Sequence, residues 1–482
     1  MKKIIRSAVV VILTVTAFFP QPVWAQRVID ENHPLYELTG TAILLLERST
    51  GRVLYERNAD MHIYPASMIK VLTSIVMLDH IAMDDIVVVG NEIDYVPFGS
   101  SRVGHELGEH ITGLNLLRGL MLPSGNDTAN VAANRVATLV TGRVLEFDEA
   151  QAVFTALMNE RARQIGMTSS NFVNAHGFHD PDMQVTARDL AILADYAIDI
   201  PMIRQVAGEM SYVGYTVPPE VEGWETMRTR HVTWNNTNRL LIGVFYHPDV
   251  TGLKTGFHTP AGHTFLGTAE RNGIELISVI GGSYNETRFV DTSRLFDYAF
   301  DYYDFHPVHV GLNPVGAITI ENPRWGEEAE VSVFGTTNFS YFLNQEELAA
   351  IEQIFIFDEA FLYHQETVES DDVLEGEEVT PTFLAPLHAG DVIGRVIYRL
   401  DGQDLFYDNV VITEDVLAWS YLSSFWYLVN YVQENPFSIF SLSLLLGVIF
   451  ICIIAGWIIA TLKKIGAKHN RLRRLQRTNY KF

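Results

Sequence analysis

The chain has 482 residues, of which 48% are hydrophobic, with 58 acidic side chains, 34 basic ones and a single cysteine. This composition excludes a collagen-like repeat, a disulfide scaffold and wholesale disorder, and it favours a packed protein of two or three domains. Because residues 26–462 hold 23 basic groups against all 58 acidic ones, too little positive charge is available to neutralise phosphates, and we expect no nucleic-acid partner.

Residues 1–25 are typical of a secretory signal peptide. The chain opens with three basic side chains, at Lys2, Lys3 and Arg6. An apolar run over residues 8–19 follows, and Val23-Trp24-Ala25 has the form of a cleavage site. We predict cleavage after Ala25, with an uncleaved anchor as the alternative.

Residues 26–304 are predicted to combine a β-sheet with helices. A turn signal at 48–51 joins β-type runs at 38–46 and 52–55. Helical spacing of apolar residues predicts helices over 68–80, 114–122, 129–140, 151–165 and 187–197. Strand patterning returns at 240–244, 262–269 and 274–280. The pattern indicates an α+β fold whose sheet takes strands from both ends of the segment, with helices inserted between them.

Residues 305–412 are predicted to form a small all-β domain. Short strand patterns separated by turn residues occur at 317–320, 329–334, 353–357, 392–399 and 409–413. The stretch 366–378 carries seven acidic residues in thirteen and is predicted to be a solvated loop.

The end of the chain has the pattern of a membrane anchor. Residues 437–462 form an uncharged apolar run of 26 residues, long enough to cross a bilayer. The basic segment 463–482 follows, and the positive-inside rule predicts that this tail is cytoplasmic and the rest of the chain lies outside. A buried core helix is the alternative. The lone Cys452 lies within the span, so we predict no disulfide in the exported part.

The segment 413–436 before this run is rich in aromatic residues. They are Trp419, Tyr421, Phe425, Trp426, Tyr427 and Tyr431. An interfacial helix with an aromatic belt and a helix packed on the soluble part are both consistent with this composition.

Lysine usage identifies the candidate site. Between residues 26 and 462 there are 21 arginines but only two lysines, Lys70 and Lys254. Arginine suffices wherever only positive charge is needed, so the two exceptions are expected where a compact amine that can lose its proton is required.

Both lysines lie in short motifs that suit nucleophilic catalysis. Ser67 and Lys70 are three residues apart, which places them on one face of a helix. A desolvated lysine near another cation can take the proton of a serine. In Lys254-Thr255-Gly256 a strand can offer an ammonium and a hydroxyl to an anion, and the glycine lets the substrate approach.

A third motif, Ser124-Gly125-Asn126, lies between the other two in the chain. A hydroxyl and an amide that project from one turn can relay a proton and hold a substrate amide. The order Ser-x-x-Lys, Ser-x-Asn and Lys-Thr-Gly is the signature of penicillin-binding proteins and serine β-lactamases.

The sequence around these motifs resembles one group of this superfamily, the serine-type D-alanyl-D-alanine carboxypeptidases. These are also called the low-molecular-weight penicillin-binding proteins. The similar segments are 64–70, 122–127, 174–177, 186–190, 236–238 and 254–256. The resemblance covers residues 30–304, and residues 305–412 resemble the β domain that follows in many members, most clearly at 385–394. It implies a β-lactamase/transpeptidase-like antiparallel sheet with flanking helices and a helical insert, followed by the β domain.

The resemblance also implies catalytic roles. Ser67 would be acylated by the penultimate D-alanine of a peptidoglycan stem peptide, with Lys70 as its base. Ser124 would pass the proton to the leaving amine. The backbone N–H groups of Ser67 and Phe257 would form the oxyanion hole. Penicillins, as β-lactam antibiotics, would acylate the same serine.

Substrate binding is implied for the remaining motif residues. Asn126 would bind the substrate backbone, Lys254 and Thr255 would receive the terminal carboxylate, and Gly256 would leave room for the peptide. Two departures from the family pattern stand out. The family often uses a C-terminal amphipathic helix where this chain has an apolar span, and the sequence after Phe257 varies, so fine substrate preference stays open.

The same residues bear on three other activities and on metal binding. The sequence His176-Gly177-Phe178-His179-Asp180 lacks a third ligand at standard metal spacing, so we predict neither a metal nor a cofactor. A class A β-lactamase would need a Glu-x-x-x-Asn loop, which does not occur between Ser124 and Lys254. A binding protein without turnover has no need of two lone lysines. An endopeptidase acting on cross-links remains open.

Overall fold

The computed structural model describes residues 33–311, 313–324, 328–362, 382–434 and 439–478. The chain divides into two compact units between Asp304 and Phe305. The predicted signal peptide and the acidic stretch 366–378 lie outside the described residues.

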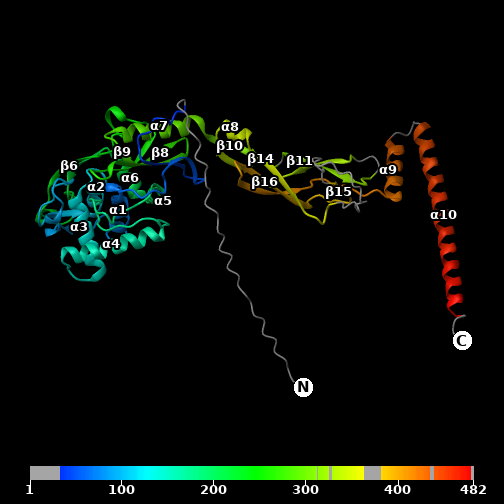
Figure 1. Cartoon of the computed structure of the whole chain (residues 1–482), viewed down its shortest axis with the longest axis horizontal. Coiled ribbons are helices and arrows are strands. Elements are labelled where there is room, and N and C mark those ends of the chain that lie inside the picture. Colours follow the sequence, from blue (N-terminus) through cyan, green and yellow to red (C-terminus); the bar gives the residue numbers. More distant parts are fainter. Residues whose placement is uncertain (1–32, 312, 325–327, 363–381, 435–438, 479–482) are drawn as a thin grey trace, which may run out of the picture. The chain divides into compact units, whose positions relative to one another are not determined.

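An antiparallel five-stranded sheet forms the centre of the first unit, with the strand order β2-β1-β9-β8-β7 (Figure 1). Its strands are β1 (Ala42–Glu47), β2 (Arg52–Arg57), β7 (Val250–His258), β8 (Gly262–Arg271) and β9 (Ile274–Ser283). The prediction of one sheet built from both ends of the segment is confirmed. The motif strand β7 lies at an edge of this sheet.

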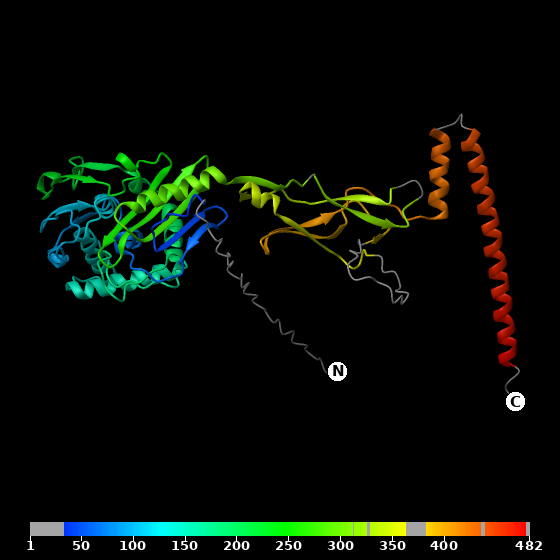
Figure 2. The same cartoon turned by 45° about the horizontal axis from the view of Figure 1, so that its top comes forward.

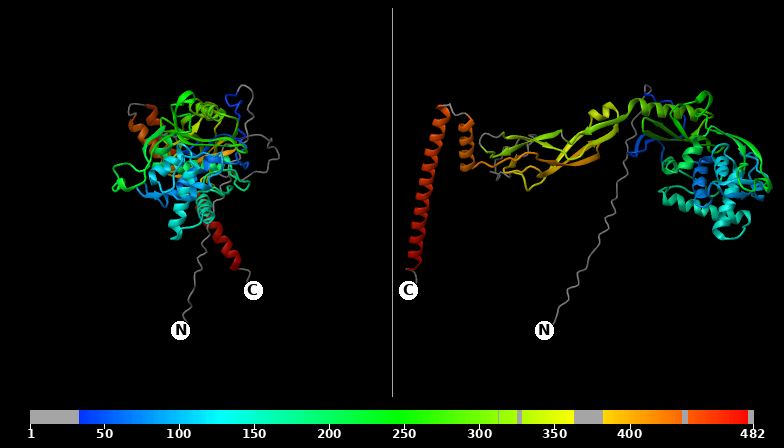
Figure 3. Two further views of the ribbon diagram at one scale, coloured as in Figure 1. Left: turned by 90° about the vertical axis from the view of Figure 1, so that its left-hand side faces the viewer. Right: turned by 180° about the vertical axis from the view of Figure 1, so that it is seen from behind.

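Side chains of alternate strand residues enter two separate cores. In β1, Ile43 and Leu45 join the cluster that includes Phe289 and Phe296 of helix α7 (Thr287–Tyr302). Their neighbour Leu44 joins the larger cluster formed with the other helices. This is the period of two expected for a strand buried on both faces. Figures 2 and 3 show the consequence, with α7 on one face of the sheet and the helices coloured blue to cyan on the other.

Most helices of this unit follow the predicted ranges within a few residues. They are α1 (Lys70–Leu78), which the 3-10 turn η1 (Ala66–Ile69) precedes, α2 (Gly113–Met121), α3 (Asn126–Thr141), α4 (Phe147–Gln164) and α5 (Ala187–Ile198). The helices α6 (Pro201–Gly208) and α7 and the 3-10 turn η2 (Asn91–Tyr95) were not predicted. Local chemistry sets their ends. The Thr112 and Thr186 hydroxyls accept hydrogen bonds from the first turns of α2 and α5. Gly142 ends α3 in a left-handed conformation.

The predicted strand at 240–244 is wrong. Leu240 and Leu241 are buried in the α7-side core, but they lie in a turn that leads into the 3-10 turn η4 (Gly243–Phe245). The apolar run at 240–244 therefore indicates buried side chains and not a strand. Two short two-stranded sheets escaped prediction. They pair β3 (Ile86–Val88) with β4 (His110–Thr112), and β5 (Ser211–Tyr215) with β6 (His231–Asn235).

The second unit is built on a six-stranded sheet with the order β14-β16-β17-β12-β11-β15. Its strands are β11 (Pro314–Glu321), β12 (Glu330–Phe334), β14 (Glu352–Phe357), β15 (Thr382–Leu384), β16 (Val392–Leu400) and β17 (Gln403–Val411). A separate pair joins β10 (Asp304–His309) and β13 (Phe339–Leu343), and α8 (Gln345–Ala349) follows. All five predicted strand patterns fall on strands of this sheet, and β10, β13 and β15 were not predicted.

Two helices follow the β domain, α9 (Tyr421–Glu434) and α10 (Ile439–Thr478). Within α10, the stretch Ser443–Lys464 is long and apolar enough to cross a membrane. Most of the aromatic segment falls in α9, where Trp426 is exposed and Leu428 is buried. Whether α9 lies at an interface or packs on the soluble part stays a prediction.

Candidate active site

Ser67 and Lys70 occupy successive turns at the start of one helix. Ser67 lies in η1 and Lys70 is the first residue of α1. The Lys70 Nζ atom donates a hydrogen bond of 2.8 Å to the Ser67 Oγ atom. The spacing of three residues thus brings an amine and a hydroxyl into direct contact, as a serine nucleophile and its base require.

Close backbone contacts hold Ser67 in place. Ala66 has a positive φ of 48°, which is unusual for a residue with a side chain. A Cβ atom added to Gly177 would lie 2.0 Å from the Ala66 carbonyl oxygen, and one added to Gly256 would lie 3.0 Å from the Ser67 nitrogen. The two glycines let a loop and the edge strand β7 approach the nucleophile where no larger residue fits.

Lys70 is fully buried among three hydrogen-bond acceptors. Besides Ser67, its Nζ atom donates to Asn126 Oδ1 at 2.7 Å and to the His176 carbonyl oxygen at 2.8 Å. Burial in the first place, and then the charge of Lys254, lowers the pKa of Lys70 well below its ordinary value. Lys70 therefore loses its proton more readily than an ordinary lysine, and its neutral amine can accept one.

The turn that carries Ser124 joins α2 to α3. Ser124 is buried and has a positive φ of 65°. The next residue, Gly125, donates its N–H to the Gly119 carbonyl at 2.8 Å, and Asn126 donates its N–H to the Ser101 carbonyl at 2.9 Å. These bonds fix the backbone on both sides of the turn, and Asn126 reaches Lys70 through its amide oxygen.

Lys254 and Thr255 project from the edge strand β7. Lys254 is 1% exposed and donates to the Thr255 carbonyl at 3.2 Å, while the Thr255 and Thr237 hydroxyls lie 2.6 Å apart. Burial, followed by the charge of Arg288, lowers the pKa of Lys254 to about 7. The two lysines that the sequence singles out are thus both buried, and they interact electrostatically.

Arg288 is a site residue that the sequence did not reveal. It lies on α7 and donates from Nη1 to the Gly256 carbonyl at 2.8 Å. Burial lowers its pKa to about 10. Arg288 is one of 21 arginines in residues 26–462 and belongs to no motif, so only the folding of α7 onto the sheet identifies it. It adds a second fixed positive charge beside Lys254.

The strand end after Gly256 exposes an aromatic surface. Phe257 is 58% exposed and stacks on His263 with ring centroids 4.3 Å apart. On the other side of the strand, the His258 ring lies 5.4 Å from the His179 ring, and Tyr64 contacts both. Burial, with the charge of His179, lowers the pKa of His258 to about 4, which keeps this imidazole neutral. In the described part of the chain no group of three potential ligands could hold a metal ion.

The residues of all three motifs thus meet through a few elements. Lys70 hydrogen-bonds Ser67 and Asn126 directly, and Gly256 lies against the Ser67 backbone. Ser124 is two residues before Asn126 in the same turn, and Phe257 follows Gly256 with its backbone at the edge of the sheet. A serine beside a base, the buried Lys254 ammonium with the half-buried Arg288 guanidinium, and a strand edge can bind an anionic peptide end and attack the preceding carbonyl.

Comparisons with known proteins agree with this chemistry. A family model described as D-alanyl-D-alanine carboxypeptidase matches residues 28–285. The D-alanyl-D-alanine carboxypeptidase DacF of Bacillus subtilis is 25% identical over 423 residues, which cover 86% of this chain and 95% of that protein. DacB2 of Mycobacterium tuberculosis is 30% identical over 263 residues, covering 53% of this chain and 81% of that protein.

Two solved structures are similar in fold. DacD of Francisella tularensis aligns with a TM-score of 0.58 at 21% identity, covering 83% of this chain and 97% of that one. The Streptomyces K15 DD-transpeptidase aligns with a TM-score of 0.50 at 27% identity, covering 55% and 98%. The predicted fold class, a transpeptidase-like sheet with flanking helices followed by a β domain and one apolar C-terminal helix, is confirmed.

Proposed function

The chain belongs to the family of D-alanyl-D-alanine carboxypeptidases, and from this membership we propose that it removes the terminal D-alanine from peptidoglycan stem pentapeptides through an acyl-enzyme on Ser67. The observation that carries the proposal is the 2.8 Å hydrogen bond from the buried Lys70 amine to the Ser67 hydroxyl. A lysine with a lowered pKa at this distance suits the task of general base.

The acylation step follows from the arrangement. Lys70 takes the Ser67 proton as Oγ attacks the carbonyl of the penultimate D-alanine. The backbone N–H groups of Ser67 and Phe257 stabilise the oxyanion. Ser124 gives its hydroxyl proton to the leaving nitrogen and takes back the proton that Lys70 holds, and the C–N bond breaks to release D-alanine. Water then attacks the ester and regenerates the Ser67 hydroxyl.

Binding of the substrate uses the edge of the sheet. The peptide lies along β7 and adds its backbone to the free edge, as extended peptides do on exposed strands. Lys254 and Thr255 bind the terminal carboxylate, and Asn126 binds the peptide amide. The small Gly256 leaves room for the peptide to approach the strand. β-Lactams bind at the same strand edge and acylate Ser67.

The same proposal places the catalytic unit outside the cytoplasmic membrane. The signal-like segment 1–25, the apolar stretch Ser443–Lys464 and the eight basic residues of 463–482 support a single-pass anchor with a cytoplasmic tail. Peptidoglycan is made on that side of the membrane, so the site faces its substrate.

Loss of D-alanine release in a Ser67→Ala variant tests the proposal. We expect the full-length protein in detergent to release D-alanine from a peptide ending in D-Ala-D-Ala, and the variant to lose at least about a thousandfold of kcat. Ser49→Ala, an exposed serine in the β1–β2 turn, is the matched control and should keep full activity. Undiminished release by Ser67→Ala refutes the proposed nucleophile.

The pH dependence provides a second test. Lys254 binds the carboxylate only while protonated, and its pKa is about 7 in the free protein. As the pH rises through this value the ammonium is lost, so kcat/KM should fall by about tenfold per pH unit on the alkaline side. Lys254→Arg keeps its charge at all these pH values and should lack this alkaline fall, even if its overall activity is lower. If kcat/KM of Lys254→Arg falls at alkaline pH as it does in the wild type, a group other than Lys254 causes the fall.

A further inference from the structure

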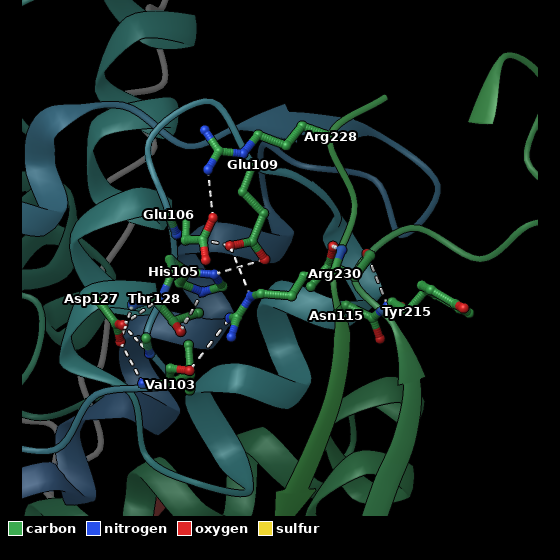
Figure 4. Close-up of polar contacts among 12 residues, drawn as sticks. Val103, His105, Glu106, Glu109, Asn115, Asp127, Thr128, Tyr215, Arg228 and Arg230 are labelled. Carbon is green, nitrogen blue, oxygen red and sulfur yellow. Dashed lines mark hydrogen bonds and ion pairs between the residues drawn. The ribbon is translucent and has the colours of Figure 1, made fainter. Parts of the chain in front are cut away.

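A buried polar network lies behind the turn that carries Ser124 and Asn126. It joins the loop 101–110, the first turn of α3 and the segment 228–230 that leads into β6 (Figure 4). Its centre is the pair His105 and Glu109, whose side chains are 0% and 1% exposed. None of the three sequence motifs includes either residue.

His105 bridges this loop to α3. Its Nε2 atom lies 3.0 Å from the Thr128 Oγ1 atom, and its Nδ1 atom lies 3.4 Å from Glu109 Oε1. Burial by itself would raise the pKa of Glu109, but the hydrogen bond and charge of His105, followed by the Glu106 N–H and Arg230, hold that pKa below its ordinary value. Glu109 is therefore a carboxylate that accepts a hydrogen bond from His105 Nδ1, and this bond fixes the ring orientation.

The bridged residue Thr128 packs directly against the catalytic turn. A Cβ atom added to Gly125 would lie 2.6 Å from Thr128 Oγ1 and 2.8 Å from Val103 Cγ1. Gly125 stands between Ser124 and Asn126 in the chain, so the position of the Thr128 hydroxyl limits where both of these residues lie.

Asp127 fastens the same loop to the same helix turn. Its Oδ1 atom accepts the Val103 N–H at 3.0 Å, and its Oδ2 atom accepts those of Gly104 at 2.8 Å and His105 at 3.1 Å. Asp127 thus holds the backbone of the loop, and the side chain of His105, which belongs to that loop, contacts Thr128. The outer part of the network is different, because the Arg228–Glu106 ion pair is 58% and 53% exposed.

We propose that His105 is a positioning residue for the reaction: it acts through Thr128 to hold Ser124 and Asn126 in register with Lys70, and Glu109 fixes its ring. The inference rests on the proposed function of the site. A residue of similar volume without ring nitrogens would fill the space but leave Thr128 free to shift, and displacement of a catalytic group lowers the rate of the chemical step without weakening substrate binding equally.

The test compares His105→Leu, Thr128→Val, the double variant and Glu106→Gln in the full-length protein in detergent. We measure kcat and KM for D-alanine release, the rate of acylation by a fluorescent penicillin and the thermal midpoint. His105→Leu and Thr128→Val are each expected to lower kcat and the acylation rate by about tenfold while KM changes by less than about twofold. The double variant should lose no more than one single variant, because both remove the same bond. Glu106→Gln should match the wild type.

Each outcome bears on a separate claim. A wild-type protein that releases no D-alanine contradicts the proposed function and not the role of His105. With an active wild type, a folded His105→Leu protein with unchanged kcat overturns the inference. If His105→Leu does not fold, Thr128→Val, which keeps the side-chain shape and loses only the hydroxyl, decides alone, and unchanged kcat there overturns it. A double variant about a hundredfold slower overturns the route through Thr128.

Discussion

Replacement of Lys70 by arginine is expected to reduce D-alanine release by about 10³-fold or more, although it preserves the positive charge. Lys70 donates to Ser67, Asn126 and the His176 carbonyl from a fully buried position. Its lowered pKa makes a neutral amine accessible, whereas an arginine does not release its proton near neutral pH. Lys70→Arg therefore removes the general base but leaves a positive charge at this position.

Lys70→Met is the matched variant, because it removes both the base and the charge. We expect the two substitutions to slow acylation by a fluorescent penicillin to a similar extent. The measurement is the single-turnover acylation rate, with circular dichroism to confirm folding. If Lys70→Arg keeps more than about a tenth of the wild-type rate, Lys70 acts through its charge and the assignment of the base is wrong.

Gly177→Ala is expected to damage both stability and activity. Gly177 has a positive φ of 81°, and an added Cβ atom would lie 2.0 Å from the Ala66 carbonyl oxygen and 3.1 Å from the Ser67 nitrogen. The left-handed conformation costs an alanine about 1–2 kcal/mol, and relief of the collision costs about 1–3 kcal/mol more. Because the atom that must move belongs to the backbone next to Ser67, kcat should also fall by about 10²-fold.

Gly142→Ala separates the two effects. Gly142 has a φ of 71°, but an added Cβ atom there would meet nothing within 4 Å. We expect this variant to lose only about 1–2 kcal/mol and to keep full activity. Thermal denaturation and D-alanine release measured on both variants make the comparison. Equal behaviour of Gly177→Ala and Gly142→Ala would show that the tight contact between Gly177 and Ala66 does not support the nucleophile.

The parts of the site that the sequence predicted are those that local spacing determines. Ser67 and Lys70 meet because they are three residues apart on a helical turn, and this contact is visible in the order of residues alone. The scarcity of lysine also identified Lys254, which is buried and has a lowered pKa, although its proposed role as a carboxylate ligand uses its protonated form.

The parts that escaped prediction depend on contacts between distant segments. Arg288 reaches Gly256 only because α7 packs on the sheet, and His105 reaches Thr128 only because a loop folds over α3. The left-handed conformation of Ala66 leaves no trace in its residue type. The apolar run at 240–244 has the composition of a strand, yet it is buried as a turn, because burial and extension give the same short pattern.

The most direct measurement for the whole account is to locate the covalent adduct. The full-length protein in detergent is incubated with a penicillin, digested and mapped by mass spectrometry, while D-alanine release is followed at each degree of labelling. We predict one adduct on the peptide that contains Ser67 and loss of D-alanine release in proportion to its occupancy. An adduct on another residue, or D-alanine release that persists when Ser67 is fully labelled, would contradict the account.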